Sequence, residues 1–176
     1  MITGRVWKFG DNINTDLMLP RPYMYKPAEE QKRAVFAATR PGWVDEVSSG
    51  DIMVVGRNFG MGSSRPAARS LRNLGIACVL AESMNGLFFR NCVNYGLVSV
   101  ECPGVAAAFQ EGERAEVSLD DFSVVNLETG RKLQGKPIPE PLLALMRGGG
   151  VFPVLEAKGL IDPLPAPASA HPKGAP

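Results

Sequence analysis

DIMVVGRNFGMGSSRPAARSLRNLGIACVLAES, residues 51–83, has the most regular pattern in the chain. It begins with an apolar, β-branched run and continues through a glycine-rich segment to RPAARSLRNLG, which has proline near its start and glycine at its end. A second apolar run, IACVLAES, follows. This order predicts a strand, a loop, a helix and a strand. Such units are typical of a buried, mainly parallel sheet with right-handed crossovers.

The sequence on either side of this stretch extends the alternation. NGLFFRNCVNYG, residues 85–96, predicts a second helix closed by Gly96, and LVSVE after it predicts a third strand. From residue 113 the pattern changes to two or three alternating strands, which indicate a β-rich annex. The other predicted elements are strands at 4–10 and 17–20 and helices at 28–39, 138–150 and 151–159. We therefore expect an α/β fold of β/β/α layers.

Length and composition limit the classes of protein. A chain of 176 residues favours one folded unit, here 1–160, followed by a disordered Pro/Ala-rich tail at 161–176. With 19 Lys and Arg against 18 Asp and Glu, the chain has no charge bias toward nucleic acid or anionic membranes. No apolar targeting region precedes the first strand, so we expect a cytoplasmic protein.

The cysteines and the single histidine argue against a metal site in this chain. Cys78, Cys92 and Cys102 lie in or beside apolar runs without metal-type spacing, so we expect buried thiols in a reducing compartment. His171 lies in the predicted tail. A histidine-based triad or a His-ligated metal within the folded part is therefore excluded.

The glycine-rich segment has the composition of an anion site. Glycines let backbone N–H groups approach a ligand closely, and a helix N-terminus favours a negative charge. Ser63 and Ser64 would add hydroxyl groups and Arg65 a guanidinium fork. A glycine-rich turn with serines that merely cap the helix is the competing interpretation. A nucleotide site is disfavoured, because no P-loop lysine follows Gly62.

A second polar segment, GDNINTD at residues 10–16, also lies after a predicted strand. Taken alone, it is typical of a turn in which Asp and Asn side chains bond their own backbone. Because both segments follow strands of one sheet, they can converge on one cleft.

Four motifs, in order, carry a family resemblance: KFGDNINTDLMLP, GRNFGMGSSR, LFFRNCVNYGL and VNLETGRKL. Together they resemble the small subunits of 3-isopropylmalate dehydratase, which correspond to the swivel domain, or fourth domain, of the aconitase superfamily. The similarity runs from about Gly4 to about Gly159. It implies a heteromeric hydro-lyase that acts on a 2-hydroxy dicarboxylic acid, such as 3-isopropylmalate or a methyl-substituted malate.

The resemblance also implies a role for each site residue. Ser63 matches the base that removes a proton beside a carboxylate, and Asp16 matches an active-site aspartate. Ser64 and Arg65 match the residues that hold a substrate carboxylate, with the Gly62 backbone beside them. In this family the [4Fe–4S] cluster and the histidines that act as acids belong to a separate large subunit. The resemblance therefore implies a large-subunit partner, and no cofactor bound by this chain.

Specificity in the family is attributed to a segment that corresponds to YMYKP, residues 23–27. Tricarboxylate enzymes resemble one another in having arginine there, whereas this chain has Tyr25 with Lys26 beside it. An apolar or small substituent is favoured, and a solvated lysine is an equally good interpretation of Lys26.

The chain departs from the family pattern at Pro66, Ala67 and Ala68, which replace the usual Glu-His-Ala, and at Met61, which replaces cysteine. The alternative hypothesis is a carboxylate-binding or regulatory module that has lost the chemistry.

Overall fold

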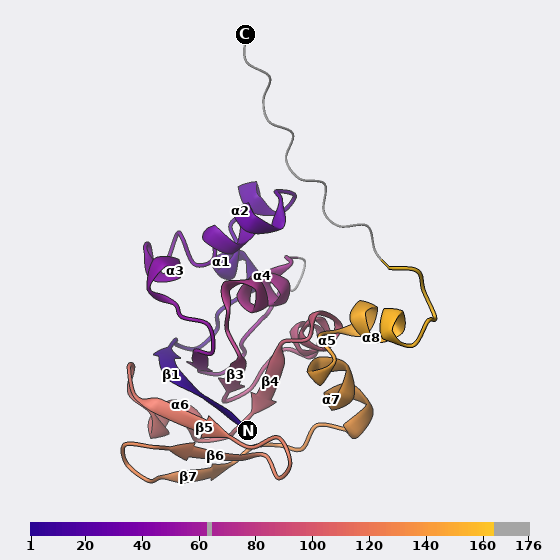
Figure 1. The fold of residues 1–176 in the computed structure, drawn as a ribbon. Coiled ribbons are helices and arrows are strands. Elements are labelled where there is room, and N and C mark those ends of the chain that lie inside the picture. The colour runs from indigo at the N-terminus through magenta and orange to yellow at the C-terminus, as the bar shows by residue number, and fades with distance from the viewer. Residues whose placement is uncertain (63–64, 164–176) are drawn as a thin grey trace.

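A seven-stranded mixed sheet forms the centre of the computed structural model, which describes residues 1–62 and 65–163 (Figure 1). The strand order is β4-β3-β2-β1-β5-β6-β7. The predicted tail lies outside the described residues from 164 onward, and so do Ser63 and Ser64. The strands are β1 (Ile2–Lys8), β2 (Ile52–Val55), β3 (Cys78–Ala81), β4 (Val98–Glu101), β5 (Arg114–Val117), β6 (Ser123–Asn126) and β7 (Lys132–Gln134).

The two halves of the sheet differ in strand direction. Strands β1 to β4 pair in parallel, and β1, β5, β6 and β7 pair antiparallel. β1 belongs to both halves, since Val6 lies opposite Ile52 of β2 while Gly4 lies opposite Ala115 of β5. The predicted α/β class is confirmed. The β-rich annex is the antiparallel continuation of the parallel strands, so one sheet contains both.

Short helices cover and connect these strands (Figure 1). α4 and α5 make the crossovers from β2 to β3 and from β3 to β4, and each ends at a glycine in the left-handed region, Gly75 (φ 110°) and Gly96 (φ 68°), as predicted. The helices are α1 (Thr15–Met18), the 3₁₀ turn η1 (Arg21–Tyr23), α2 (Ala28–Arg33), α3 (Trp43–Glu46), α4 (Ala67–Leu74), α5 (Gly86–Tyr95), α6 (Val105–Ala108), α7 (Glu140–Arg147) and α8 (Val151–Ala157). Among the described residues, no helix is long and apolar enough to cross a membrane.

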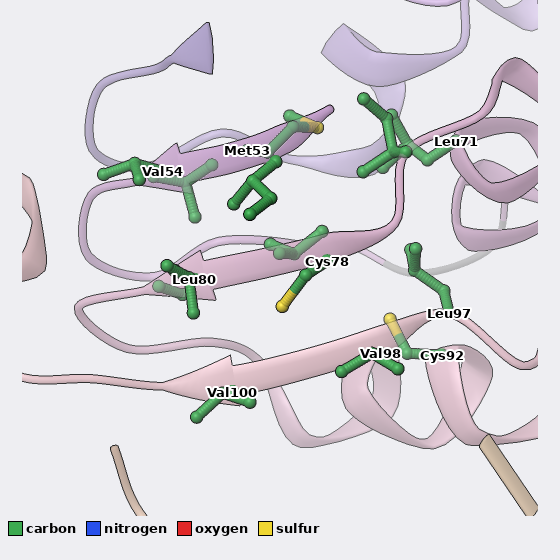
Figure 2. Packing of buried hydrophobic residues seen from close by; sticks show 14 of the residues in the cluster. Met53, Val54, Leu71, Cys78, Leu80, Cys92, Leu97, Val98 and Val100 are labelled. Atoms are coloured by element: carbon green, nitrogen blue, oxygen red, sulfur yellow. The ribbon is translucent and has the colours of Figure 1, made fainter. Parts of the chain in front are cut away.

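The core lies between the parallel strands and their helices. Every residue of β2 and β3 is buried, which explains why these strands are continuous apolar runs. Leu71 of α4 and Cys92 of α5 pack over them, and Figure 2 shows both side chains with those of the strands. This packing fixes the strand ends from which the candidate site extends.

The predicted strand at 17–20 is wrong, because α1 occupies Thr15–Met18. Asn14 caps this helix: its Oδ1 accepts a hydrogen bond of 2.8 Å from the backbone N of Leu17. Asp16 in the first turn is also favourable there. Local capping therefore outweighs the short apolar run, whose Met18 and Leu19 are still buried.

The helix predicted over 28–39 is shorter than expected, because α2 ends at Arg33. Three residues later Phe36 adopts a left-handed conformation, φ 54°, and its backbone N donates to Met18 O at 2.8 Å. The Phe36 ring is buried and stacks on Phe9 with centroids 4.4 Å apart. Burial of this aromatic ring therefore outweighs continuation of the helix.

Arg40 links this aromatic region to the opposite side of β1. Its guanidinium donates to both carboxylate oxygens of Glu111, at 2.8 and 2.5 Å, and lies 4.9 Å from the centroid of the Trp7 ring. The hydrogen bonds from Arg40 are the main reason that the pKa of Glu111 lies below its ordinary value. The Lys8 backbone N also donates to Glu111, at 3.2 Å.

We predict that Arg40→Met lowers the free energy of unfolding in a pH-dependent way. Because the Glu111 pKa is depressed in the folded protein, its contribution is present above the unfolded value of about 4.3 and is lost as pH falls through the folded value. The charge-dependent loss should be about 0.2–1 kcal/mol near neutral pH. Urea unfolding at several pH values measures it, and a loss that stays constant as the carboxylate is protonated would contradict it.

Candidate active site

The two predicted polar segments lie side by side at one edge of the sheet. β1 and β2 are parallel neighbours, so the chain leaves both at the same edge, and a short parallel bridge joins Asn14 to Met61. Figure 1 shows this part of the chain between the strands and α1, α2 and α4. The backbone hydrogen bonds between the segments are Asn12 N to Arg57 O (2.7 Å), Gly60 N to Ile13 O (2.8 Å), Thr15 N to Met61 O (2.8 Å) and Gly56 N to Gly10 O (3.2 Å). The predicted convergence is confirmed.

Side chains strengthen this contact between the segments. Asp11 Oδ1 accepts from the backbone N of Arg57 at 2.7 Å. The amide of Asn58 donates to Asn12 Oδ1 at 2.8 Å, and both asparagines have left-handed backbones, with φ of 56° and 58°. Sequence analysis identified these residues only as turn formers. Asparagines that tolerate positive φ in both segments were the signal that the two loops interlock.

Glycine is required in this loop for packing as well as for backbone conformation. Gly60 has φ 81°, and a Cβ built on it would overlap the ring of Phe88 at the start of α5. The neighbouring Phe59 is fully buried and meets Phe88 edge to face, with ring centroids 5.2 Å apart. The loop is thus pressed against α5, which holds the chain that leads to Arg65.

We predict that Gly60→Ala lowers the free energy of unfolding by about 1–3 kcal/mol, because it combines a steric overlap with a strained backbone. Gly10→Ala is the matched control in the facing loop, since a Cβ at Gly10 would meet nothing within 4 Å. Equilibrium unfolding in urea compares the two variants. Equal stability of both would show that the Phe88 contact does not constrain the loop.

Arg65 and Asp16 form an ion pair between the two segments. Arg65 Nε donates to Asp16 Oδ1 at 2.8 Å. The Arg65 side chain is 10 % exposed and that of Asp16 62 %, so the pair has a buried and a solvent-facing end. The pairing brings together two residues that are 49 positions apart and that sequence analysis placed in one site.

Met24 and Thr15 lie beside this ion pair. The Arg65 Nη1 atom lies 3.2 Å from Met24 Sδ. Thr15 is fully buried, and its hydroxyl has no hydrogen-bond partner within 1–62 and 65–163. This hydroxyl lies 3.4 Å from the point where a Cβ of Gly62 would stand. Sequence analysis did not identify Met24 or Thr15. The apolar YMYKP segment was a signal for Met24, but its contact with Arg65 depends on tertiary packing.

In the proposed specificity segment, residues 23–27, Tyr25 faces solvent and Lys26 forms an ion pair with a residue of α2. Tyr25 is 90 % exposed, and Lys26 pairs with Glu30 at 3.8 Å. Gln31 holds the segment in place, because its Nε2 donates to Met24 O at 2.9 Å and its Oε1 accepts from Arg69 of α4 at 2.8 Å. The roles of Tyr25 and Lys26 therefore stay predictions.

A separate cavity of about 560 Å³ lies at the same sheet edge, beside α6. Its lining includes Gly10, Asp11, Gly56 and Glu82, but not Asp16 or Arg65. Glu82 is occupied by backbone groups, since it accepts from Gly104 N and Ala106 N at 2.9 and 2.8 Å. The carboxylates of this cavity thus hold loops and α6 in place.

Comparison with known proteins agrees with this geometry. The aconitase C-terminal domain family matches residues 11–104, which include both loops and the helices after them. The isopropylmalate/citramalate isomerase small subunit of Methanocaldococcus jannaschii is 42 % identical over 160 residues, 90 % of this chain and 95 % of that protein. The chain belongs to the family of 3-isopropylmalate dehydratase small subunits.

Other members of the family give the same result. A 3-isopropylmalate dehydratase small subunit of Methanopyrus kandleri is 40 % identical over 161 residues, 90 % of this chain and 95 % of that protein. A crystal structure described as 3-isopropylmalate dehydratase of Methanocaldococcus jannaschii matches with a TM-score of 0.83 and 29 % identity. It covers 90 % of this chain and 95 % of that one, so the dehydratase small-subunit fold extends over nearly the whole chain.

The departures from the dehydratase small-subunit pattern are compatible with the fold. Pro66 is the N-cap of α4, with φ −74° and ψ 41°, and makes no side-chain cap hydrogen bond. Ala67 and Ala68 are each 1 % exposed and belong to the core. Small residues fill these positions at the start of α4, and Arg65 still reaches Asp16.

The cysteines do not form a cluster site of the kind that a dehydratase large subunit is expected to hold. Cys78, Cys92 and Cys102 are buried, as predicted, and burial raises the pKa of Cys92 to about 12 and that of Cys102 to about 11. Metal ligation needs thiolates, which these environments oppose. Within 1–62 and 65–163, no group of three or more His, Cys, Asp or Glu side chains could hold a metal ion.

Proposed function

We propose that this chain is the small subunit of a two-subunit hydro-lyase that isomerises 3-isopropylmalate, or a methyl-substituted malate, through dehydration and rehydration. The ion pair between Arg65 and Asp16 is the observation that carries the proposal. It supports the proposal because it joins the arginine of the second segment to the aspartate of the first, in a chain whose relatives are named for this reaction. The three buried, free cysteines fit a reducing compartment, and we assign the enzyme to the cytoplasm.

The chemistry divides among the residues of the Gly62–Arg65 segment. We assign Ser63 as the base that removes the proton from the carbon beside a carboxylate. The electron pair of the broken C–H bond then forms the double bond as the hydroxyl group of the substrate leaves. A serine hydroxyl is a weak base, so its alkoxide needs stabilisation by backbone N–H groups and a cation. The first turn of α4 and Arg65 are suited to this role.

Substrate binding follows from the same arrangement. We assign Ser64, Arg65 and the Gly62 backbone to one substrate carboxylate. Arg65 would bind it through Nη2 and the second N–H of Nη1, while Nε stays on Asp16 and Nη1 keeps its contact with Met24. Asp16 orients the guanidinium and completes the site. Met24 beside Arg65 favours an apolar substituent, and Tyr25 and Lys26 are proposed to line the same end.

The large subunit supplies the remaining chemistry. We propose that it carries a [4Fe–4S] cluster, which as a Lewis acid would assist departure of the hydroxyl group. This chain then contributes half of the active site. Its contribution is the base, the carboxylate-binding groups and the selection of the substituent.

Reconstitution tests this proposal. The purified chain, mixed with its purified large subunit, should convert 3-isopropylmalate through an unsaturated acid that absorbs in the ultraviolet, and neither subunit alone should do so. Turnover by this chain alone would contradict the divided site. Carboxylate binding without turnover in the mixture would instead support a module that has lost the chemistry.

A further inference from the structure

A cavity of about 260 Å³ lies next to the end of β4. The candidate active site lies next to the ends of β1 and β2, so β3 stands between the two. It is formed where β4 ends, where α5 begins and where the chain leaves β7 for α7. The lining residues are Met84, Gly86, Phe89, Ser99, Glu101, Lys136, Pro137, Ile138 and Pro139. None of the assigned site residues takes part in it.

The polar wall of this cavity carries both signs of charge. Glu101 Oε2 accepts from Lys136 Nζ at 2.6 Å, and Glu101 Oε1 accepts from the backbone N of Met84 at 2.8 Å. The Glu101 side chain is 24 % exposed and that of Lys136 is 63 % exposed. The lysine can therefore turn toward a ligand while the carboxylate is held in place. The backbone N of Lys136 also donates to Glu101 O at 2.7 Å, which fixes the segment.

The rest of the lining is apolar. Met84 and Phe89 are partly buried against the core, Ile138 is 7 % exposed, and two prolines add rigid apolar surface. A cavity of about 260 Å³ has room for a molecule the size of a free amino acid.

We propose that this cavity binds a zwitterionic α-amino acid with an apolar side chain. The ligand carboxylate pairs with Lys136, its ammonium group pairs with Glu101, and its side chain lies among Met84, Phe89 and Ile138. A ligand with only one charge would leave the other member of the opened ion pair without compensation. The chemistry therefore selects a zwitterion over a simple carboxylate or amine.

The cavity wall is joined directly to the glycine loop. Phe59 N donates to Ser83 O at 3.1 Å, and Asn85 N donates to Phe59 O at 2.8 Å, so the 83–85 segment pairs with the loop on both sides of Met84. Ligand binding in the cavity should therefore change the environment of the Phe59 backbone. Binding itself does not depend on the proposed function, because it is measured without the large subunit.

Calorimetric titration and amide NMR of the whole chain test the proposal, with L-leucine as the probe. We expect saturable binding that shifts the amide signals of Met84, Phe59 and Lys136. The two charge-deleted analogues, 4-methylpentanoate and 3-methylbutylamine, should bind about tenfold more weakly, the scale of one hydrogen bond to a charged group. Absence of binding at millimolar L-leucine, or equal binding of the analogues, would overturn the proposal.

Two lysine variants test whether L-leucine binds in this cavity or elsewhere on the protein surface. Lys136→Met should weaken L-leucine binding about tenfold. Lys132→Met, which removes another exposed lysine from nearby β7, should leave it unchanged. Equal affinity in the two variants would overturn the assignment. The amide spectrum of each free variant reports whether it is folded, so loss of binding is distinguished from loss of structure.

Discussion

Replacement of Ser63 by alanine is expected to lower kcat of the reconstituted enzyme by about 10²–10⁴-fold, the usual contribution of a positioned acid or base. KM should change little, because Ser64 and Arg65 still bind the carboxylate. The proposed division of roles predicts the reverse for Ser64→Ala, which should mainly raise KM. Steady-state kinetics of the two variants, each mixed with the same large subunit, provide the comparison.

The adjacent serines serve as controls for each other. Since both substitutions remove one hydroxyl from the same segment, general damage to the loop or to subunit assembly would affect them alike. A Ser63→Ala enzyme with full kcat would exclude Ser63 as the base. A fall in kcat of the same size in both variants would show that the roles are not divided as proposed.

Arg65→Lys is expected to lower kcat/KM by roughly 10- to 100-fold, mainly through KM. In the structure Arg65 Nε binds Asp16 and Nη1 contacts Met24 Sδ, so we expect a substrate carboxylate to bind Nη2 and the second N–H of Nη1. A lysine ammonium cannot span both groups in this way, although it keeps the charge. The loss therefore tests the planar fork and not the net charge of the site.

Arg57→Lys is the matched control for this prediction. Arg57 lies in the same loop and is exposed. Its backbone N and O form hydrogen bonds with Asp11 and Asn12 of the facing segment, and the substitution keeps these bonds. Its kinetics should match those of the unchanged enzyme. An Arg65→Lys enzyme with unchanged kcat and KM would remove Arg65 from the proposed carboxylate site.

Prediction from sequence succeeded where local chemistry decides the structure. Gly75 and Gly96 end their helices because the left-handed conformation at a helix end is accessible to glycine. β2 and β3 were predicted because strands buried on both faces must be apolar throughout. The loop convergence followed from parallel strands, whose carboxyl ends share an edge.

Prediction failed where a side-chain cap or tertiary packing competes with the intrinsic preference of a segment. The segment at 17–20 contains an apolar run, but Asn14 caps it as a helix. The segment at 28–39 has helix-forming residues, but burial of the Phe36 ring against Phe9 ends the helix early. In both cases tertiary contacts or a side-chain cap contribute more than intrinsic propensity, which is worth only a few tenths of a kcal/mol per residue, roughly.

From the sequence we predicted the βαβ core, the two glycine- and asparagine-rich segments and, through family resemblance, the proposed roles of Ser63, Ser64, Arg65 and Asp16. Only the tertiary structure placed Arg65 Nε on Asp16, Met24 against the guanidinium and Phe88 under Gly60. The physical reason is that helix ends and strand periodicity depend on neighbours in the chain. The direction of a guanidinium and the closeness of a ring to a glycine depend on packing between segments that are tens of residues apart.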